Sequence, residues 1–173
     1  MSIHIIIDGY NLIRQSAHLS IIDLQDIQQG REALVDMLAA YKRIKAHQIT
    51  VVFDGTRAPL FSQERDRQKG ISILFSSNNQ TADDVIKKMA RREKQKALIV
   101  SSDRDILRSV ASYGAATITA NAFEDKLAMT LYSGADDIDD GENEGWKPTT
   151  RKKGPSRRQP KRQRRNRGKI RKL

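Results

Sequence analysis

Short apolar runs that alternate with helical patterns are the feature that most constrains how this chain can fold. Four β-branched runs lie at 3–7, 49–53, 71–75 and 97–100, and we expect a fifth at 116–119. Runs of this length that lack polar alternation are typical of strands buried on both faces of a parallel sheet. Between them, apolar residues recur at three- and four-residue spacing over 33–44, 85–90, 106–110 and 127–131. We therefore predict a three-layer α/β fold, with a mostly parallel sheet and helices on both faces. The polar segment 55–70 is expected to be a long irregular loop.

The positive charge of the chain is concentrated at its end. Residues 146–173 contain 14 Lys and Arg and no acid, residues 136–144 contain six acids and no base, and residues 1–135 have 18 bases and 15 acids. A basic segment with so few apolar residues is predicted to be disordered when free and to bind a polyanion such as RNA. We thus predict a domain over 1–132, an acidic linker over 133–145 and a disordered basic tail over 146–173. A merely solubilising tail stays open as an alternative, as does competition between the acidic linker and RNA for the tail.

The composition excludes several classes of protein. The chain has no cysteine, so it has no disulfide, thiolate zinc site or cysteine nucleophile. It contains no apolar run near the ~20 residues of a membrane span, and its start lacks the basic region of a signal peptide. These observations predict a cytoplasmic protein without membrane contact. The phosphate-binding P-loop and the G-x-S-x-G nucleophile motif are also absent from the sequence.

Acidic residues follow the predicted strands at the points where the strands end. The acids are Asp8, Asp54, Asp103 and Asp105, together with Asp83 and Asp84 at the start of a predicted helix. Ligands of such sheets bind at the carboxyl ends of the strands, so these carboxylates are expected to converge. Clustered like charges repel, and Mg²⁺ or Mn²⁺ is the usual counterion for such a group. Turns and helix caps would explain each aspartate singly, but would not place all of them at one edge.

Four motifs in order give the chain a family resemblance. The segments 5–13 (Ile-Ile-Ile-Asp-Gly-Tyr-Asn-Leu-Ile), 51–59 (with Val-Val-Phe-Asp-Gly and Ala-Pro), 81–86 (Thr-Ala-Asp-Asp-Val-Ile) and 99–105 (Ile-Val-Ser-Ser-Asp-Arg-Asp) resemble those of NYN-type nucleases. Among these PIN-like enzymes, the similarity is to the YacP-like bacterial branch, and it covers about 1–132. One departure is Thr81, which stands where flap-type nucleases carry a glutamate.

The resemblance implies an Mg²⁺- or Mn²⁺-dependent RNA endonuclease associated with translation-coupled mRNA cleavage on the ribosome. Transferred by motif, the catalytic residues would be Asp8, Asp83, Asp84, Asp103 and Asp105. The metal ligands would be Asp8, Asp84, Asp103, Asp105 and Asp54, and the choice between Asp83, Asp84 or both stays open. Asn11 would orient a phosphate or a ligand carboxylate.

Basic residues near these motifs and in the tail are candidates for RNA binding. They are Arg14, Arg57, Arg65, Arg67, Lys69, Arg151, Lys152, Lys153, Arg157, Arg158, Arg164 and Arg165. The rival hypotheses are a non-catalytic RNA-binding or ribosome-associated module and a flap-type DNA nuclease.

Overall fold

A six-stranded sheet organises the protein, in a computed structural model that describes residues 2–57, 65–77, 79–136 and 160–173. The strands are β1 (His4–Asp8), β2 (Gln48–Phe53), β3 (Arg65–Gln68), β4 (Ile71–Phe75), β5 (Ala97–Val100) and β6 (Ala116–Ile118). Their order is β3-β4-β2-β1-β5-β6, and all neighbours are parallel except β3 and β4. All five expected apolar runs are strands of this sheet, which confirms the predicted mostly parallel architecture.

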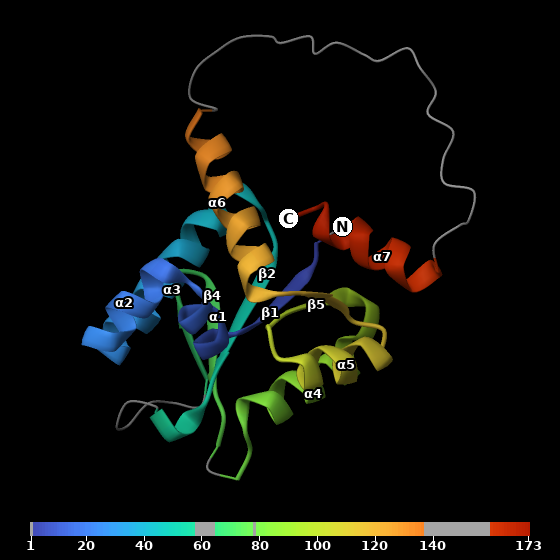
Figure 1. Ribbon diagram of the computed structural model, residues 1–173, viewed down its shortest axis with the longest axis horizontal. Coiled ribbons are helices and arrows are strands. Elements are labelled where there is room, and N and C mark those ends of the chain that lie inside the picture. The colour runs from blue at the N-terminus through green and yellow to red at the C-terminus, as the bar shows by residue number, and fades with distance from the viewer. Residues whose placement is uncertain (1, 58–64, 78, 137–159) are drawn as a thin grey trace.

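Helices cover both faces of the sheet and complete the three predicted layers (Figure 1). One layer contains α1 (Gly9–Gln15), α3 (Ile27–Ile44) and α6 (Ala120–Asp136), with α2 (Ala17–Gln25) packed on α3. The other layer contains α4 (Ala82–Glu93) and α5 (Arg104–Ser112). Two short 3₁₀ turns, η1 (Gly55–Arg57) and η2 (Lys94–Lys96), follow β2 and α4. Alternation along the strands sends Ile5 and Ile7 into the larger core and Ile6 into the core beneath α4.

The helix α1 begins directly after β1, where the sequence pattern suggested only an Asp-Gly turn. Gly9 is required there by packing, since a Cβ atom would lie 2.3 Å from the Phe53 ring. Asp8 caps the helix by accepting a hydrogen bond from the Asn11 backbone N–H at 3.3 Å. The end of β1 and the start of α1 are thus fixed by one carboxylate.

Part of the predicted loop 55–70 is a strand. Residues Arg65–Gln68 form β3, which pairs antiparallel with β4 through the turn at Gly70 (φ 82°). All four residues of β3 are exposed, so this edge strand carries no apolar alternation that could reveal it. Residues 58–64, including Pro59, lie outside the described part of the chain.

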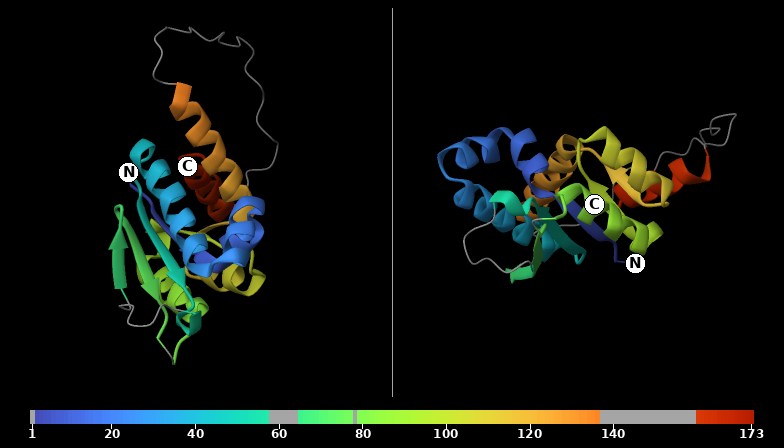
Figure 2. Two further views of the ribbon diagram at one scale, coloured as in Figure 1. Left: turned by 90° about the vertical axis from the view of Figure 1, so that its left-hand side faces the viewer. Right: turned by 90° about the horizontal axis from the view of Figure 1, so that it is seen from below.

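The end of the chain also differs from the expectation of disorder. Residues Lys161–Ile170 form the helix α7, which contacts β6. The red C-terminal end of the chain also lies near the orange helix α6 (Figure 2), where the Thr130 hydroxyl donates to the Leu173 carbonyl at 3.2 Å. The Asn166 side chain donates to the Thr117 carbonyl at 3.1 Å and accepts from the Thr117 N–H at 2.7 Å. The Leu173 side chain is 4% exposed, and its carbonyl accepts from the Tyr41 hydroxyl at 3.2 Å. These few contacts order a segment that is otherwise polar.

The acidic linker and residues 146–159 fall mostly or wholly outside the described residues, and the three-part division of the chain stays a prediction.

Candidate active site

Four of the predicted carboxylates surround one cavity of about 370 Å³ at the carboxyl end of the sheet. They are Asp8, Asp54, Asp83 and Asp103, and the other lining residues are Tyr10, Asn11, Arg14, Thr56 and Ala82. The four acids come from the ends of β1, β2 and β5 and from the first turn of α4. The structure therefore brings together residues that are up to 95 positions apart in the chain.

Asp8 is the most perturbed of these acids. Its Oδ1 accepts from the Asn11 backbone, and its Oδ2 accepts from the Ser101 hydroxyl at 3.1 Å. Burial raises the pKa of Asp8 to about 6, with smaller contributions in the same direction from the charges of Asp83 and Asp103, although the two hydrogen bonds oppose the shift. The cavity thus holds a carboxylate that is costly to ionise without a nearby cation.

Ser101 links Asp8 to Asp103. It is fully buried, and its hydroxyl donates to Asp8 while accepting from the Asp103 backbone N–H at 3.1 Å. Asp103 in turn caps α5, since its Oδ1 accepts from the N–H groups of Asp105 (2.7 Å) and Ile106 (3.2 Å). Sequence reasoning gave Ser101 no role, although its place directly after an apolar strand and two residues before an aspartate was the available signal.

The adjacent acids Asp83 and Asp84 have different positions. Asp83 lines the cavity, and burial raises its pKa, with the charge of Asp103 acting in the same direction and Lys87 opposing it. Asp84 points back to the helix start and accepts from the Thr81 N–H (3.2 Å) and hydroxyl (3.0 Å), which lowers its pKa. Of the two, Asp83 lines this cavity, whereas Asp84 completes the capping box of α4 with Thr81.

Asp54 and Asp105 also differ in their positions relative to the acidic cavity. Asp54 borders the cavity, and its Oδ1 accepts from the Thr56 N–H (2.9 Å) and hydroxyl (2.6 Å), so a turn holds it in place. Asp105 is exposed in the first turn of α5 and does not line this cavity. The structure thus supports Asp54 as part of the acidic group more than Asp105.

Two polar residues complete the cavity wall. Asn11 accepts from the Ser102 N–H at 2.7 Å through its side-chain oxygen, so its NH₂ group is the part suited to a phosphate oxygen. Arg14 lines the cavity, with its guanidinium carbon 5.9 Å from the centre of the Tyr10 ring. Tyr10 and Thr56, which the sequence analysis did not single out, belong to the same wall.

The other predicted RNA-binding residues are dispersed. Arg65, Arg67 and Lys69 are exposed on or beside β3, and Lys69 pairs with Asp36. Arg164 and Arg165 are exposed on α7. Arg57 closes η1, and Arg151, Lys152, Lys153, Arg157 and Arg158 lie outside the described residues.

The donor set of the acidic cavity fits a hard divalent cation. Within the described ranges, no group of three Asp, Glu or His side chains is positioned to hold a metal ion by itself. Mg²⁺ nevertheless needs only one or two protein carboxylates, because waters and substrate oxygens fill its other positions. Burial and mutual repulsion at Asp8 and Asp83 are the strain that such a cation would relieve.

Comparison with known families identifies the domain. The model of the YacP-like NYN domain matches residues 5–167. The chain belongs to the YacP-like NYN domain family. The match extends beyond the predicted domain and includes most of α7. This NYN family is one of PIN-like nucleases, which generally use divalent metals, and membership supports an RNA-related nuclease function.

Individual relatives agree with this membership. The chain is 25% identical over 87 residues to YacP of Bacillus subtilis (strain 168), and the match covers 50% of the chain and 51% of YacP, about half the length of that relative. A crystal structure of Rae1 (YacP) from Bacillus subtilis has a TM-score of 0.65 at 22% identity, over 80% of each chain. A tryptophan-to-leucine variant of Rae1 gives 0.66 at 20% identity, over 80% of this chain and 82% of the other. These structures share the fold of this NYN domain.

Among the described residues, no helix is long and apolar enough to span a bilayer.

Proposed function

We propose that this NYN domain is a metal-dependent endoribonuclease whose active site is the acidic cavity. The convergence of Asp8, Asp54, Asp83 and Asp103 on one cavity carries the proposal. Family membership supports a nuclease, and the hard oxygen donors support Mg²⁺ or Mn²⁺ as the cofactor.

The residues of the cavity would have different roles in cleavage. Asp8, Asp83 and Asp103 would hold the cation, with Asp54 at the rim. A bound divalent cation supplies a Lewis acid that lowers the pKa of water and neutralises charge on a phosphodiester. Ser101 fixes Asp8 relative to Asp103 through the two hydrogen bonds described above. Asn11 and Arg14 face the same space and would hold the phosphate oxygens.

RNA is the proposed substrate, with mRNA on the ribosome as the specific form to test. The exposed basic residues of α7, among them Arg164 and Arg165, would bring the domain to RNA through counterion release. Since α7 lies beside β6, these charges have a defined position relative to the sheet.

The deciding experiment is a cleavage assay on naked and ribosome-bound mRNA, with Mn²⁺ or with EDTA. Asp8→Asn and Asp103→Asn should abolish cleavage, while the fold survives because asparagine caps helices as well as aspartate does. Asp125→Asn, on the exposed surface of α6, is the matched control and should cleave as the parent does. Cleavage by both active-site variants at the parental rate would refute the assignment. Tight RNA binding in EDTA, without cleavage of any RNA when Mn²⁺ is present, would instead favour a binding module.

A further inference from the structure

A second and larger cavity, of about 750 Å³, lies along α4 between this helix and the strands β2, β3 and β4. We call it the α4 groove. Val85, Lys88 and Arg92 of α4 form one wall, and Arg65 of β3 stands at the other. In the sheet, α4 packs mainly against β1, β2 and β5, so β4 and β3 extend beyond the helix and leave the groove open.

The groove and the acidic cavity share one face of the sheet. Side chains alternate along β1, so His4 in the groove and Asp8 in the acidic cavity point to the same side. The same alternation applies to Thr50 of β2 and to Asp54, the residue directly after β2. Between these pairs Ile6 and Val52 are fully buried beneath α4, and the groove instead reaches the carboxyl end of the sheet at Ser77 and Gln80, which follow β4 and precede the start of α4. The helix α4 borders both, with Asp83 at one end and Arg92 near the other.

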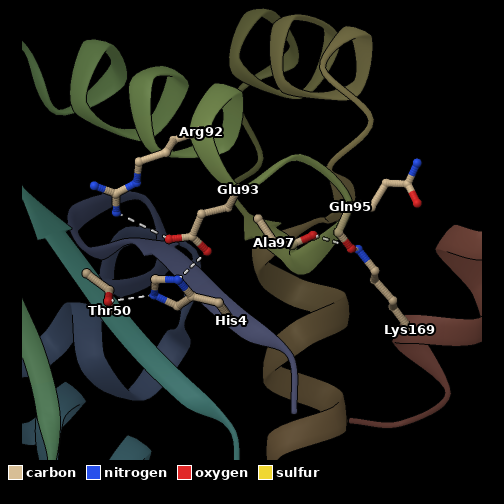
Figure 3. Close-up of polar contacts among 7 residues, drawn as sticks. All are labelled: His4, Thr50, Arg92, Glu93, Gln95, Ala97 and Lys169. Carbon is tan, nitrogen blue, oxygen red and sulfur yellow. Dashed lines mark hydrogen bonds and ion pairs between the residues drawn. The ribbon is translucent and has the colours of Figure 1, made fainter. Parts of the chain in front are cut away.

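The floor of the groove is polar and fixed (Figure 3). His4 Nδ1 lies 2.5 Å from Glu93 Oε2, and His4 Nε2 lies 2.8 Å from the Thr50 hydroxyl. Arg92 approaches the other oxygen of Glu93 at 3.4 Å. With His4 only 7% exposed, the chain of hydrogen bonds holds β1, β2 and the end of α4 together beneath the cavity.

The rim of the groove is cationic. Arg65, Lys88, Arg91 and Arg92 line it, and among the described residues that line it Asp66 is the one acid. Asp66 already accepts hydrogen bonds from the Arg67 N–H and the Gln68 amide. Leu74, Val85 and Met89 add apolar surface within the same cavity. Proteins that bind single-stranded nucleic acid combine a positively charged groove that follows the phosphates with side chains against which base faces lie.

We propose that the α4 groove binds the single-stranded RNA that flanks the scissile phosphate. The phosphates follow Arg65, Lys88 and Arg92, and bases contact Leu74 and Met89. This inference rests on the proposed cleavage of RNA at the acidic cavity, and it defines the substrate as a single strand held on one side of the cleavage point.

The test compares the double variant Arg65→Glu/Lys88→Glu with the control Arg43→Glu/Lys126→Glu, which makes the same charge change on α3 and α6. All four substituted side chains lie outside the cores, and thermal melts confirm folding. Binding of a long and a short fluorescein-labelled single-stranded RNA is measured by anisotropy in EDTA over a series of KCl concentrations. The groove variant should bind the long RNA about tenfold more weakly, and its salt slope should fall by about 1.4, since each phosphate contact contributes about 0.7. The control should keep the parental slope.

Parental affinity and slope in the groove variant, or an equal loss in the control, would overturn the proposal. A cleavage assay with Mn²⁺ separates this failure from failure of the proposed function. If the parent cleaves RNA, and the groove variant cleaves both the long and the short RNA at the parental rate, the proposed role of the α4 groove is wrong and the proposed active site is retained. If the parent does not cleave but its RNA binding depends on Arg65 and Lys88, the groove stands and the nuclease assignment is wrong.

Discussion

Asp8→Asn should make the metal-free protein more stable while removing its activity. The pKa of Asp8 is raised from 3.8 to about 6, so the folded protein holds this proton more tightly than the unfolded chain does. Folding therefore opposes ionisation, and the parent loses stability as the pH rises from about 4 through 6. Two pKa units correspond to about 3 kcal/mol, which is the penalty that an uncharged asparagine avoids at pH 7 or above.

The substitution keeps the hydrogen bond to Asn11 and reverses the one to Ser101. An asparagine oxygen still accepts from the Asn11 N–H, and the new NH₂ group would donate to the second lone pair of the Ser101 oxygen, so that the Ser101 hydroxyl loses its present acceptor. For a chain of this length, about 3 kcal/mol corresponds to a rise in Tm of roughly 6–12 °C. Thermal melts in EDTA at about pH 4 and pH 8 measure it. The difference between variant and parent should be present at pH 8 and absent at pH 4.

Mg²⁺ should reverse the comparison. A cation that binds only the folded parent stabilises it in proportion to the logarithm of its concentration over Kd, whereas the variant lacks this ligand. The control Asp125→Asn should follow the parent under every condition. A variant that is no more stable than the parent at pH 8 in EDTA would refute the account of Asp8 as a strained carboxylate.

Two further predictions concern neighbouring acids and the terminal helix. Asp83→Asn should abolish cleavage, because Asp83 lines the acidic cavity. Asp84→Asn should lower Tm slightly and leave cleavage intact, because Asp84 contacts the helix start and does not line that cavity. An equal loss of cleavage in both variants would contradict this. Asn166→Ala should cost about 1–2 kcal/mol and speed amide exchange at Thr117, because two hydrogen bonds to that backbone are lost. Thermal melts and hydrogen exchange test it, with Gln163→Ala on the exposed side of α7 as the control.

The sequence predicted the parallel strands and their terminal acids because both depend on local patterns. Burial on two faces requires apolar runs such as 3–7 and 97–100, and the end of each strand places Asp8 or Asp103 at the same edge. The choice between Asp83 and Asp84 could not be made in this way. Adjacent helical residues point in different directions, and only the Thr81 cap determines which of them turns away from the cavity.

The elements that the sequence did not reveal are stabilised by distant contacts. The strand β3 is polar throughout and is held by pairing with β4. The helix α7 has the composition of a disordered segment, yet Asn166 and Lys169 attach it to backbone groups far away in the chain. Burial lowers the pKa of Lys169, whose ammonium donates to the Ala97 carbonyl at 3.0 Å (Figure 3). Single polar side chains of this kind leave no periodic signature.

The position of α7 also determines how the sheet avoids pairing with other molecules. A parallel sheet exposes unpaired backbone groups at its two outer strands, which can recruit strands from other chains and so start aggregation. At β6 the Asn166 amide occupies the Thr117 N–H and carbonyl, as a neighbouring strand would, and at β3 a row of exposed charged and polar side chains discourages such pairing. Removal of the basic tail, which includes α7, would therefore expose the unpaired edge of β6 and also remove positive charge. Loss of RNA binding in a truncated protein could then result from aggregation at that edge or from the missing charge. Charge substitutions on the exposed side of α7 remove the charge and leave the edge covered, so they distinguish the two causes.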